Sequence, residues 1–275
     1  GRGVRDHRIE VKTKDEIGKL AAAFNEMAAN LQAYTARLEQ SNRDLEEFVY
    51  IATHDLQEPL RKILAFGDRL VAKYEAAFDD VGRDYLNRMH NATRRLQTLI
   101  DDLLVYSRVS TQVKPWARIN LTDVAQAVVS DLESQLRQTK GRVEFGTLPV
   151  IEADPDQIYQ LLKHLIVNAL KFRQEGLPPV VKLRGSLVGQ DGILSHETCQ
   201  IIVEDNGIGF EQQFAERIFK PFQRLHRRGE YGGSGMGLAI CRRIVERHGG
   251  YITAESRPGE GATFLVTLPV RQANS

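Results

Sequence analysis

The sequence predicts an all-α helical hairpin followed by an α+β layer domain. Three observations predict this fold class. Apolar residues recur at spacings of three and four through Tyr106, short β-branched runs alternate with helical patterns after Pro115, and glycine-rich segments follow some of those runs. The length of 275 residues also suits about two domains, at roughly 100–200 residues per domain.

The first long helix is predicted from a seam of apolar side chains. They recur at alternating spacings of three and four from Ile17 to Ala52, and only Ser41 interrupts them. Such a narrow, sustained stripe is typical of a coiled coil. The alternative is an amphipathic helix on a globular core. However, roughly 36 residues at 1.5 Å each span about 54 Å, which is too long for one small core.

A second seam with the same spacing runs from Tyr85 to Tyr106. Residues 78–82 suit the connection between the two helices, with Asp80 as the N-cap of the second and Gly82 as a flexible position. Two long helices joined by a short loop form an antiparallel hairpin. One hairpin leaves half of its apolar face uncovered, so we expect a homodimer that buries this face in a four-helix bundle.

His54 lies on the side of the first helix opposite the apolar sector that contains Leu56 and Ile63, so its ring is expected in solvent. The next residue, Asp55, can hydrogen-bond one ring nitrogen and leave the other as a nucleophile. The simpler alternative is a solvated surface histidine. Pro59 removes a backbone donor nearby and is expected to bend the helix.

Several classes of protein are disfavoured. A formal charge of +1 with both signs mixed argues against a nucleic-acid partner. Cys199 and Cys241 cannot form a disulfide framework, which favours a reducing compartment. His90 has no neighbouring acid and is interpreted as a solvated residue, and the other histidines show no ligand-like spacing. Because no stretch approaches the roughly 18 apolar residues of a membrane span, this piece is expected to be cytoplasmic.

After Pro115 the pattern predicts several helices with a mostly antiparallel mixed sheet. Strands are expected at 143–145, 150–153, 180–187, 198–204, 251–256 and 263–268. Helices are expected at 121–138, 155–173 and 235–248, and Gly249-Gly250 ends the last of them.

Two clusters in this half carry chemistry suited to a nucleotide. His164, Asn168 and Lys171 share one predicted helix, where an amide oxygen suits Mg²⁺ and a lysine can hold a phosphate. Asp205 to Gly209 follow a predicted strand. There a carboxylate can accept a hydrogen bond from an exocyclic amine, and the glycines let the backbone approach a ring. Alone, the first cluster could be a solvated helix face and the second a tight turn.

A third cluster, Gly233 to Leu238, opens the last predicted helix. Glycine-rich backbone at a helix N-terminus favours phosphate, because unpaired N–H groups and the helix dipole both attract anions. The segment fits neither the P-loop nor the dinucleotide fingerprint. The three clusters in this order predict a site for a nucleotide triphosphate with magnesium.

Taken in order, the motifs resemble those of a bacterial two-component sensor histidine kinase over essentially the whole chain. Residues 48–60, FVYIATHDLQEPL, are similar to the phosphoacceptor box of phytochrome-type members. Residues 165–172 resemble the N box, 205–210 the first glycine box, 219–222 the F box and 233–238 the second glycine box, and residues 15–27 are similar to the end of a HAMP relay module.

The resemblance implies a role for each matching residue. His54 would be phosphorylated from ATP, and Asp55 would orient its ring and take up the proton. Asn168 would hold Mg²⁺, Lys171 would contact phosphate, and Asp205 would accept from the adenine amino group. The remaining ATP-binding positions would be Phe172, Gly207, Gly209, Phe219, Phe222, Gly233, Gly235, Gly237 and Leu238, with residues 210–234 as a lid.

The resemblance also implies a domain division and partners. Residues 1–36 would be the end of HAMP with a signalling coiled coil, 37–112 the dimerising phosphotransfer hairpin, and 113–275 an ATP-binding α+β sandwich of the Bergerat type. The phosphoryl group would pass to an aspartate of a response regulator receiver domain. A sensor module and a membrane span would precede this cytoplasmic part in the full-length parent. The alternatives are a catalytically weak dimeric scaffold and a GHKL-type ATPase.

Two positions depart from the family pattern. His164 stands where the N box usually has asparagine, and where hydrolytic relatives carry a water-activating glutamate. The absence of that glutamate favours transfer to histidine over hydrolysis of ATP. Glu58 stands where many members have a threonine or asparagine that assists removal of the phosphate, so the resemblance does not carry phosphatase activity over to this chain.

Overall fold

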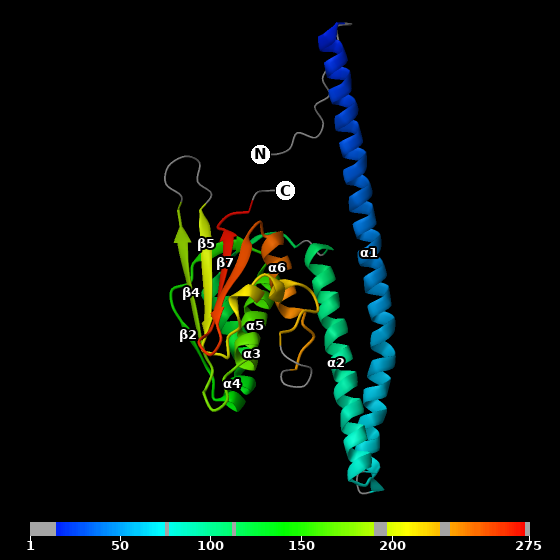
Figure 1. Cartoon of the computed structure of the whole chain (residues 1–275), viewed down its shortest axis with the longest axis vertical. Coiled ribbons are helices and arrows are strands. Elements are labelled where there is room, and N and C mark those ends of the chain that lie inside the picture. The colour runs from blue at the N-terminus through cyan, green and yellow to red at the C-terminus, as the bar shows by residue number, and fades with distance from the viewer. Residues whose placement is uncertain (1–14, 75–76, 112–113, 190–196, 226–231, 273–275) are drawn as a thin grey trace. The chain divides into compact units, whose positions relative to one another are not determined.

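The computed structural model describes residues 15–74, 77–111, 114–189, 197–225 and 232–272. The chain forms two compact units, residues 1–52 and 53–275. Helix α1 (Glu16–Tyr74) runs from the first unit into the second, as Figure 1 shows. It stays helical through Pro59, and the predicted long first helix is therefore confirmed.

In residues 15–52 the predicted seam lies on the surface of the chain. Its exposed large apolar side chains are Ile17, Leu20, Phe24, Met27, Leu31, Tyr34, Leu38 and Phe48. An exposed apolar stripe of this length is typical of a coiled-coil strand whose partner is another chain.

The second unit begins with a hairpin of α1 and helix α2 (Asp80–Thr111), which are joined by a hydrogen bond of 2.7 Å from Gln57 Nε2 to Asp101 Oδ1. The prediction that Asp80 caps α2 is wrong by one residue. The Asp79 carboxylate accepts from the Gly82 N–H at 2.7 Å, and the Asp79 carbonyl accepts the first helical bond, from the Arg83 N–H. Asp79 is therefore the N-cap, because its backbone already takes part in the first turn.

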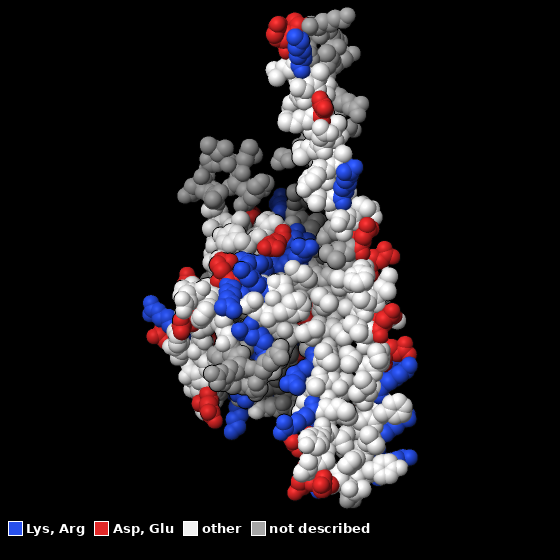
Figure 2. Space-filling model, turned by 45° about the vertical axis from the view of Figure 1, so that its right-hand side comes forward, with Lys and Arg blue, Asp and Glu red and all other residues white. Residues whose placement is uncertain are grey.

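The buried face of α2 is offset from the predicted seam. Tyr85, Met89 and Leu96 of that seam are exposed. The side chains that α2 buries include Leu86, His90, Thr93, Ile100 and Leu104. Figure 2 shows much uncharged surface over the hairpin at the lower right, bordered by acidic and basic side chains.

His90 is not a solvated residue, contrary to the expectation from sequence. Its side chain is only 10% exposed, and its Nδ1 lies 3.5 Å from Asp68 Oδ1. The ring fits against Gly67, where a Cβ atom would lie 2.0 Å from His90 Nε2. Gly67 on the facing helix has no side chain and so leaves space for the His90 ring. The residues next to His90 in the sequence give no sign of this packing.

The second half contains a five-stranded sheet. Helices α3 (Leu121–Asp131), α5 (Pro155–Lys171) and α6 (Gly237–Arg247) lie on one side of it (Figure 1). The strand order is β2-β4-β5-β7-β6, with β2 and β4 parallel and the other pairs antiparallel, as predicted. The strands span Arg142–Phe145 (β2), Val180–Val188 (β4), Thr198–Asp205 (β5), Tyr251–Arg257 (β6) and Gly261–Pro269 (β7).

A separate antiparallel pair joins β1 (Ala117–Asn120) to β3 (Val150–Ala153). The sequence predicted β3 but not β1. Strand β1 has four residues and buries only Ile119 well, so it lacks the apolar alternation that marks a strand.

The predicted helix 121–138 is divided at Leu132 into α3 (Leu121–Asp131) and α4 (Glu133–Thr139). Helix α5 (Pro155–Lys171) begins where expected, because Asp154 accepts from two backbone N–H groups and Pro155 occupies the first turn. Helix α6 (Gly237–Arg247) ends at His248.

The apolar face of α5 packs into the core between the sheet and α3 and α6, so α5 is fixed along most of its length. Within the part of the chain that the structure describes, no helix is both long and apolar enough to span a bilayer.

Gly67→Ala tests the fit between the two hairpin helices. Alanine usually stabilises a helix interior by about 1 kcal/mol relative to glycine. Here we expect destabilisation by about 1–3 kcal/mol, because the new Cβ would overlap His90 Nε2. Urea unfolding followed by circular dichroism measures the difference.

The control is the same substitution in a His90→Ala background, where space for the Cβ is available. There Gly67→Ala should be neutral or stabilising. A similar loss in both backgrounds would mean that the His90 ring does not limit the approach of the helices.

Candidate functional site

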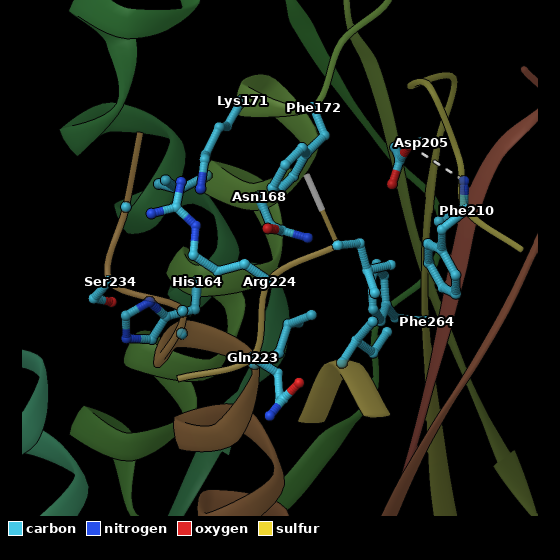
Figure 3. A pocket seen from close by; sticks show the side chains of 18 of the residues that line it. His164, Asn168, Lys171, Phe172, Asp205, Phe210, Gln223, Arg224, Ser234 and Phe264 are labelled. Carbon is cyan, nitrogen blue, oxygen red and sulfur yellow. Dashed lines mark hydrogen bonds between the residues drawn. The ribbon is translucent and has the colours of Figure 1, made fainter. Parts of the chain in front are cut away.

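A cavity of about 400 Å³ opens beside helix α5 in the second unit (Figure 3). Its walls come from α5, the end of β5 with the loop after it, residues 223–225, the glycine-rich segment before α6, and α2. The predicted site residues that line it are Asn168, Lys171, Phe172, Asp205, Gly209, Gly233, Gly235, Gly237 and Leu238.

Three of the predicted ATP-binding residues do not line this cavity. Gly207 lies behind Asp205, to which it donates its N–H. Phe219 is buried in the core and packs edge-on against Phe264, with ring centroids 6.4 Å apart. Phe222 is exposed and has a φ of 61°. Part of the expected lid, residues 226–231, lies outside the described residues.

Asp205 provides a fixed acceptor at one end of the cavity. Its Oδ1 accepts from the N–H groups of Gly207 at 2.8 Å and Ala262 at 3.3 Å. Burial raises the pKa of the Asp205 carboxyl, and the two backbone hydrogen bonds oppose this shift. Because Oδ1 is held by the backbone, Oδ2 remains as an acceptor for a ligand's amino group.

Close backbone packing behind Asp205 requires glycine. Gly209 has a φ of 61°, and a Cβ on it would lie 2.0 Å from the Arg257 carbonyl oxygen. A Cβ on Gly261 would lie 1.9 Å from the Asp205 carbonyl oxygen. The sequence singled out Gly209 but not Gly261, which resembles any other turn glycine until β5 and β7 are paired.

Apolar side chains from separate elements form the wall beside Asp205. They include Val167, Ile208, Phe210, Ile218, Leu225 and Phe264. These residues are of ordinary core type, and the sequence singled out none of them as a site residue, although Val167, Ile208 and Phe210 lie within the boxes at 165–172 and 205–210. A carboxylate acceptor next to an apolar wall suits a flat heterocycle with an exocyclic amine.

The other end of the cavity is cationic. Lys171 Nζ lies 4.4 Å from the centre of the Phe172 ring, and a Cβ on Gly233 would be 2.6 Å from that nitrogen. Burial and the nearby Arg224 lower the pKa of Lys171 to about 8, while the charge of Asp102 opposes the shift. A half-buried cation, Lys171, and an exposed one, Arg224, in one concavity suit an anionic ligand. Sequence reasoning missed Arg224, because it lies in a loop without a helical or strand pattern.

The glycine-rich segment borders this cationic end. Gly233 and Gly235 have φ values of 120° and 80°, which other residues rarely adopt. Ser234 Oγ accepts from the Met236 N–H at 3.1 Å and donates to Asp102 Oδ2 on α2. Helix α6 starts at Gly237, so its N-terminus faces the cavity lining.

His164 and Asn168 lie one turn apart on α5 and both line the cavity. Burial keeps the pKa of His164 below its ordinary value, and its Nε2 has no hydrogen-bond partner among the described residues. No group of three or more His, Cys, Asp or Glu in the described chain could hold a metal alone. The Asn168 amide oxygen therefore fits Mg²⁺ only if a ligand's phosphates supply further oxygens, which is the usual way that proteins bind this ion.

His54 is exposed on α1, as predicted, with 70% of its side chain accessible. Its Nδ1 lies 3.4 Å from Asp55 Oδ1, and the Asp55 side chain is 75% exposed. Glu58 pairs with Lys62 at 2.6 Å, and this contact lowers the pKa of the Glu58 carboxyl. His54 does not line the cavity.

Family models match three successive parts of the chain. Residues 1–33 match the HAMP domain, and residues 44–112 match the His Kinase A (phospho-acceptor) domain. Residues 153–272 match the model described as histidine kinase-, DNA gyrase B-, and HSP90-like ATPase.

Among curated proteins, the chain is 40% identical over 246 residues to the phytochrome-like protein Cph1 of Synechocystis. The match covers 88% of this chain and 31% of Cph1. The chain spans about a third of the length of the first curated relatives that it matches.

Two solved structures share the fold. Full-length ShkA in complex with AMPPNP has a TM-score of 0.62 at 24% identity, covering 83% of this chain and 47% of that chain. ThkA in complex with the response regulator protein TrrA has a TM-score of 0.58 at 23% identity, covering 87% of this chain and 67% of that chain.

The environment of Lys171 predicts how the affinity for a phosphate-bearing ligand depends on pH. With ADP as the ligand, the affinity should fall about 25-fold between pH 7.5 and 9.5, because binding needs the protonated amine, whose pKa is about 8. Calorimetry in two buffers of different ionisation enthalpy should show proton uptake on binding.

Lys171→Arg is the matched control, since a guanidinium stays charged across this range. Its affinity for ADP should change little between the same pH values. An equal decline in both proteins would assign the titration to another group.

Proposed function

The chain belongs to the two-component sensor histidine kinases, and from this we propose that it phosphorylates its own His54 with ATP and passes the phosphoryl group to an aspartate of a response regulator. One observation carries the proposal. The chain has a cavity with a carboxylate acceptor suited to adenine at one end and cations at the other. It also has an exposed histidine that is paired with a carboxylate.

The proposed site gives each part of ATP a partner. Asp205 Oδ2 would accept from the adenine amino group, and the wall that contains Phe210 and Phe264 would cover the ring. Lys171, Arg224 and the start of α6 would hold the phosphates. Asn168 would hold Mg²⁺, whose charge offsets that of the phosphates. Gly207, Phe219 and Phe222 would shape and anchor the surrounding loops, although they do not line the cavity.

The proposed transfer needs little covalent chemistry from the rest of the protein. His54 Nε2 would attack the terminal phosphorus with its lone pair, the bond to the bridging oxygen would break, and ADP would leave. Asp55 would hold Nδ1 and take up the proton that the phosphorylated ring releases. His54 lies outside the cavity of its own chain. Either the ATP-binding part must therefore move to bring ATP to His54, or the ATP bound by a second chain must reach it.

Exposed apolar side chains on both hairpin helices support a homodimer. They include Leu56, Ile63, Phe66, Leu70, Tyr85, Met89 and Leu96. Pairing two hairpins into a four-helix bundle would cover them. ThkA is described in complex with a response regulator protein, which supports the same class of partner here.

We further propose the division into residues 1–36, 37–112 and 113–275 as relay, phosphotransfer and ATP-binding parts. The HAMP match at residues 1–33 supports a relay role for that segment. Such a relay implies a sensor module and a membrane span in the parent protein, with this part on the cytoplasmic side.

Labelling with γ-labelled ATP and Mg²⁺ tests the proposed acceptor. Wild type should take up an acid-labile, base-stable label that maps to the peptide containing His54. His54→Gln should lose at least about 95% of it, because glutamine offers no nucleophilic nitrogen. The variant should bind ADP as tightly as wild type, which shows that its cavity is intact.

Equal labelling of His54→Gln would overturn the acceptor assignment. Release of phosphate without labelling of wild type would instead support the ATPase alternative. Tight regulator binding without labelling would support the scaffold.

Asn168→Leu tests the proposed metal ligand by binding alone. In wild type, Mg²⁺ should strengthen ADP binding about tenfold, which corresponds to about 1.4 kcal/mol. In the variant this difference should fall below about twofold, because the amide oxygen is lost, while affinity without Mg²⁺ stays similar.

Asn91→Leu, on the exposed side of α2, is the control and should keep the full effect of Mg²⁺. A normal response of Asn168→Leu to Mg²⁺ would show that the ion is held without Asn168.

A further inference from the structure

Asp102 of α2 reaches the cationic end of the cavity from outside the ATP-binding part. It is half-buried and lines the cavity together with Thr98 of the same helix. Its Oδ2 accepts from Ser234 Oγ, which in turn accepts from the Met236 N–H. One carboxylate therefore connects α2 to the glycine-rich segment that starts α6.

The charge of Asp102 acts on the groups proposed to bind phosphate. It raises the pKa of Lys171 and of His164, against the burial that lowers both. Among the described residues that line the cavity, the carboxylates are Asp102 and Asp205. Asp205 is held by the backbone at the other end, so Asp102 is the anion that the cationic end already contains.

We propose that Asp102 competes with the terminal phosphate of the nucleotide, so that the docked α2 selects against the triphosphate relative to the diphosphate. The inference rests on the proposed nucleotide site. ADP and ATP share the adenine, ribose and first two phosphates, and ATP adds negative charge on the side of Lys171 and the glycine-rich segment. Like charges brought close together in a partly desolvated site repel strongly.

The competition couples the nucleotide to the hairpin. While Asp102 accepts from Ser234, α2 is held against the start of α6. A third phosphate repels the carboxylate and weakens this link, so the triphosphate favours release of α2 and the diphosphate does not. The docking of α2 therefore depends on whether the cavity holds a triphosphate or a diphosphate. The same helix pairs with α1 through the hydrogen bond between Asp101 and Gln57.

Asp102→Asn tests the competition, because it removes the charge while keeping the size and a group that can still bond Ser234. Calorimetry with Mg²⁺ would measure the Kd of ADP and of the ATP analogue AMPPNP for the full chain. We expect the variant to bind AMPPNP about tenfold more tightly than wild type and to change its affinity for ADP less than threefold.

Asp101→Asn is the matched control. It removes the same charge from the adjacent residue, whose side chain faces Gln57 of α1. Its ratio of AMPPNP to ADP affinity should equal that of wild type. A second measurement uses hydrogen exchange: AMPPNP, but not ADP, should increase exchange around Asp102 in wild type.

The competing outcomes are distinct. An unchanged affinity ratio in Asp102→Asn, or an equal change in Asp101→Asn, would overturn the inference while leaving the nucleotide site in place. Failure of wild type to bind ADP at all would overturn the proposed site and, with it, this inference.

Discussion

The site depends on one buried carboxylate, Asp205, whose Oδ1 is held by two backbone N–H groups. One of them belongs to Ala262, which faces Asp205 in the pairing of β5 with β7, so the sheet register places the acceptor. The other belongs to Gly207, where a Cβ would lie 2.5 Å from the Phe172 carbonyl oxygen. That carbonyl accepts from the Ile208 N–H at 2.8 Å and so ties the loop to the end of α5. The sheet and the loop thus meet at Asp205 Oδ1, and the hydrogen bond to the Phe172 carbonyl ties that loop to α5.

The opposite end of the cavity is determined by charge and not by backbone hydrogen bonds, because Lys171, Arg224 and Asp102 line it. Lys171 is deprived of water by burial and repelled by Arg224, and Asp102 from α2 compensates for part of this cost. A ligand with phosphates would compensate for it better, because phosphates bring more charge and several acceptor oxygens. The Asp205 end is therefore held by hydrogen bonds and suits a ring. At the Lys171 end the balance of charge changes with the ligand, so this end suits phosphates.

Sequence reasoning predicted most elements of the second half, because their apolar periodicity is local and strong. It also pointed to Asn168, Lys171, Asp205 and Gly209, which line the cavity. It missed β1, which is short and mostly exposed, and the break at Leu132 within a continuous helical pattern. It also missed Arg224 and Asp102, whose relevance comes only from tertiary packing. A lone charged residue in a loop or on a helix carries no signal of which cavity it will face.

The histidines of the described chain show how environment decides function. A nucleophilic ring needs an accessible nitrogen with a lone pair and a partner that orients the other nitrogen. His248 is buried and uses both nitrogens, since Nδ1 bonds the Ile244 carbonyl and Nε2 accepts from the Asp154 N–H. His90 and His164 each bury Nε2 without a partner. His54 alone among these four combines an exposed ring with a carboxylate at Nδ1, so the proposed acceptor differs from the other three in its surroundings and not in its residue type.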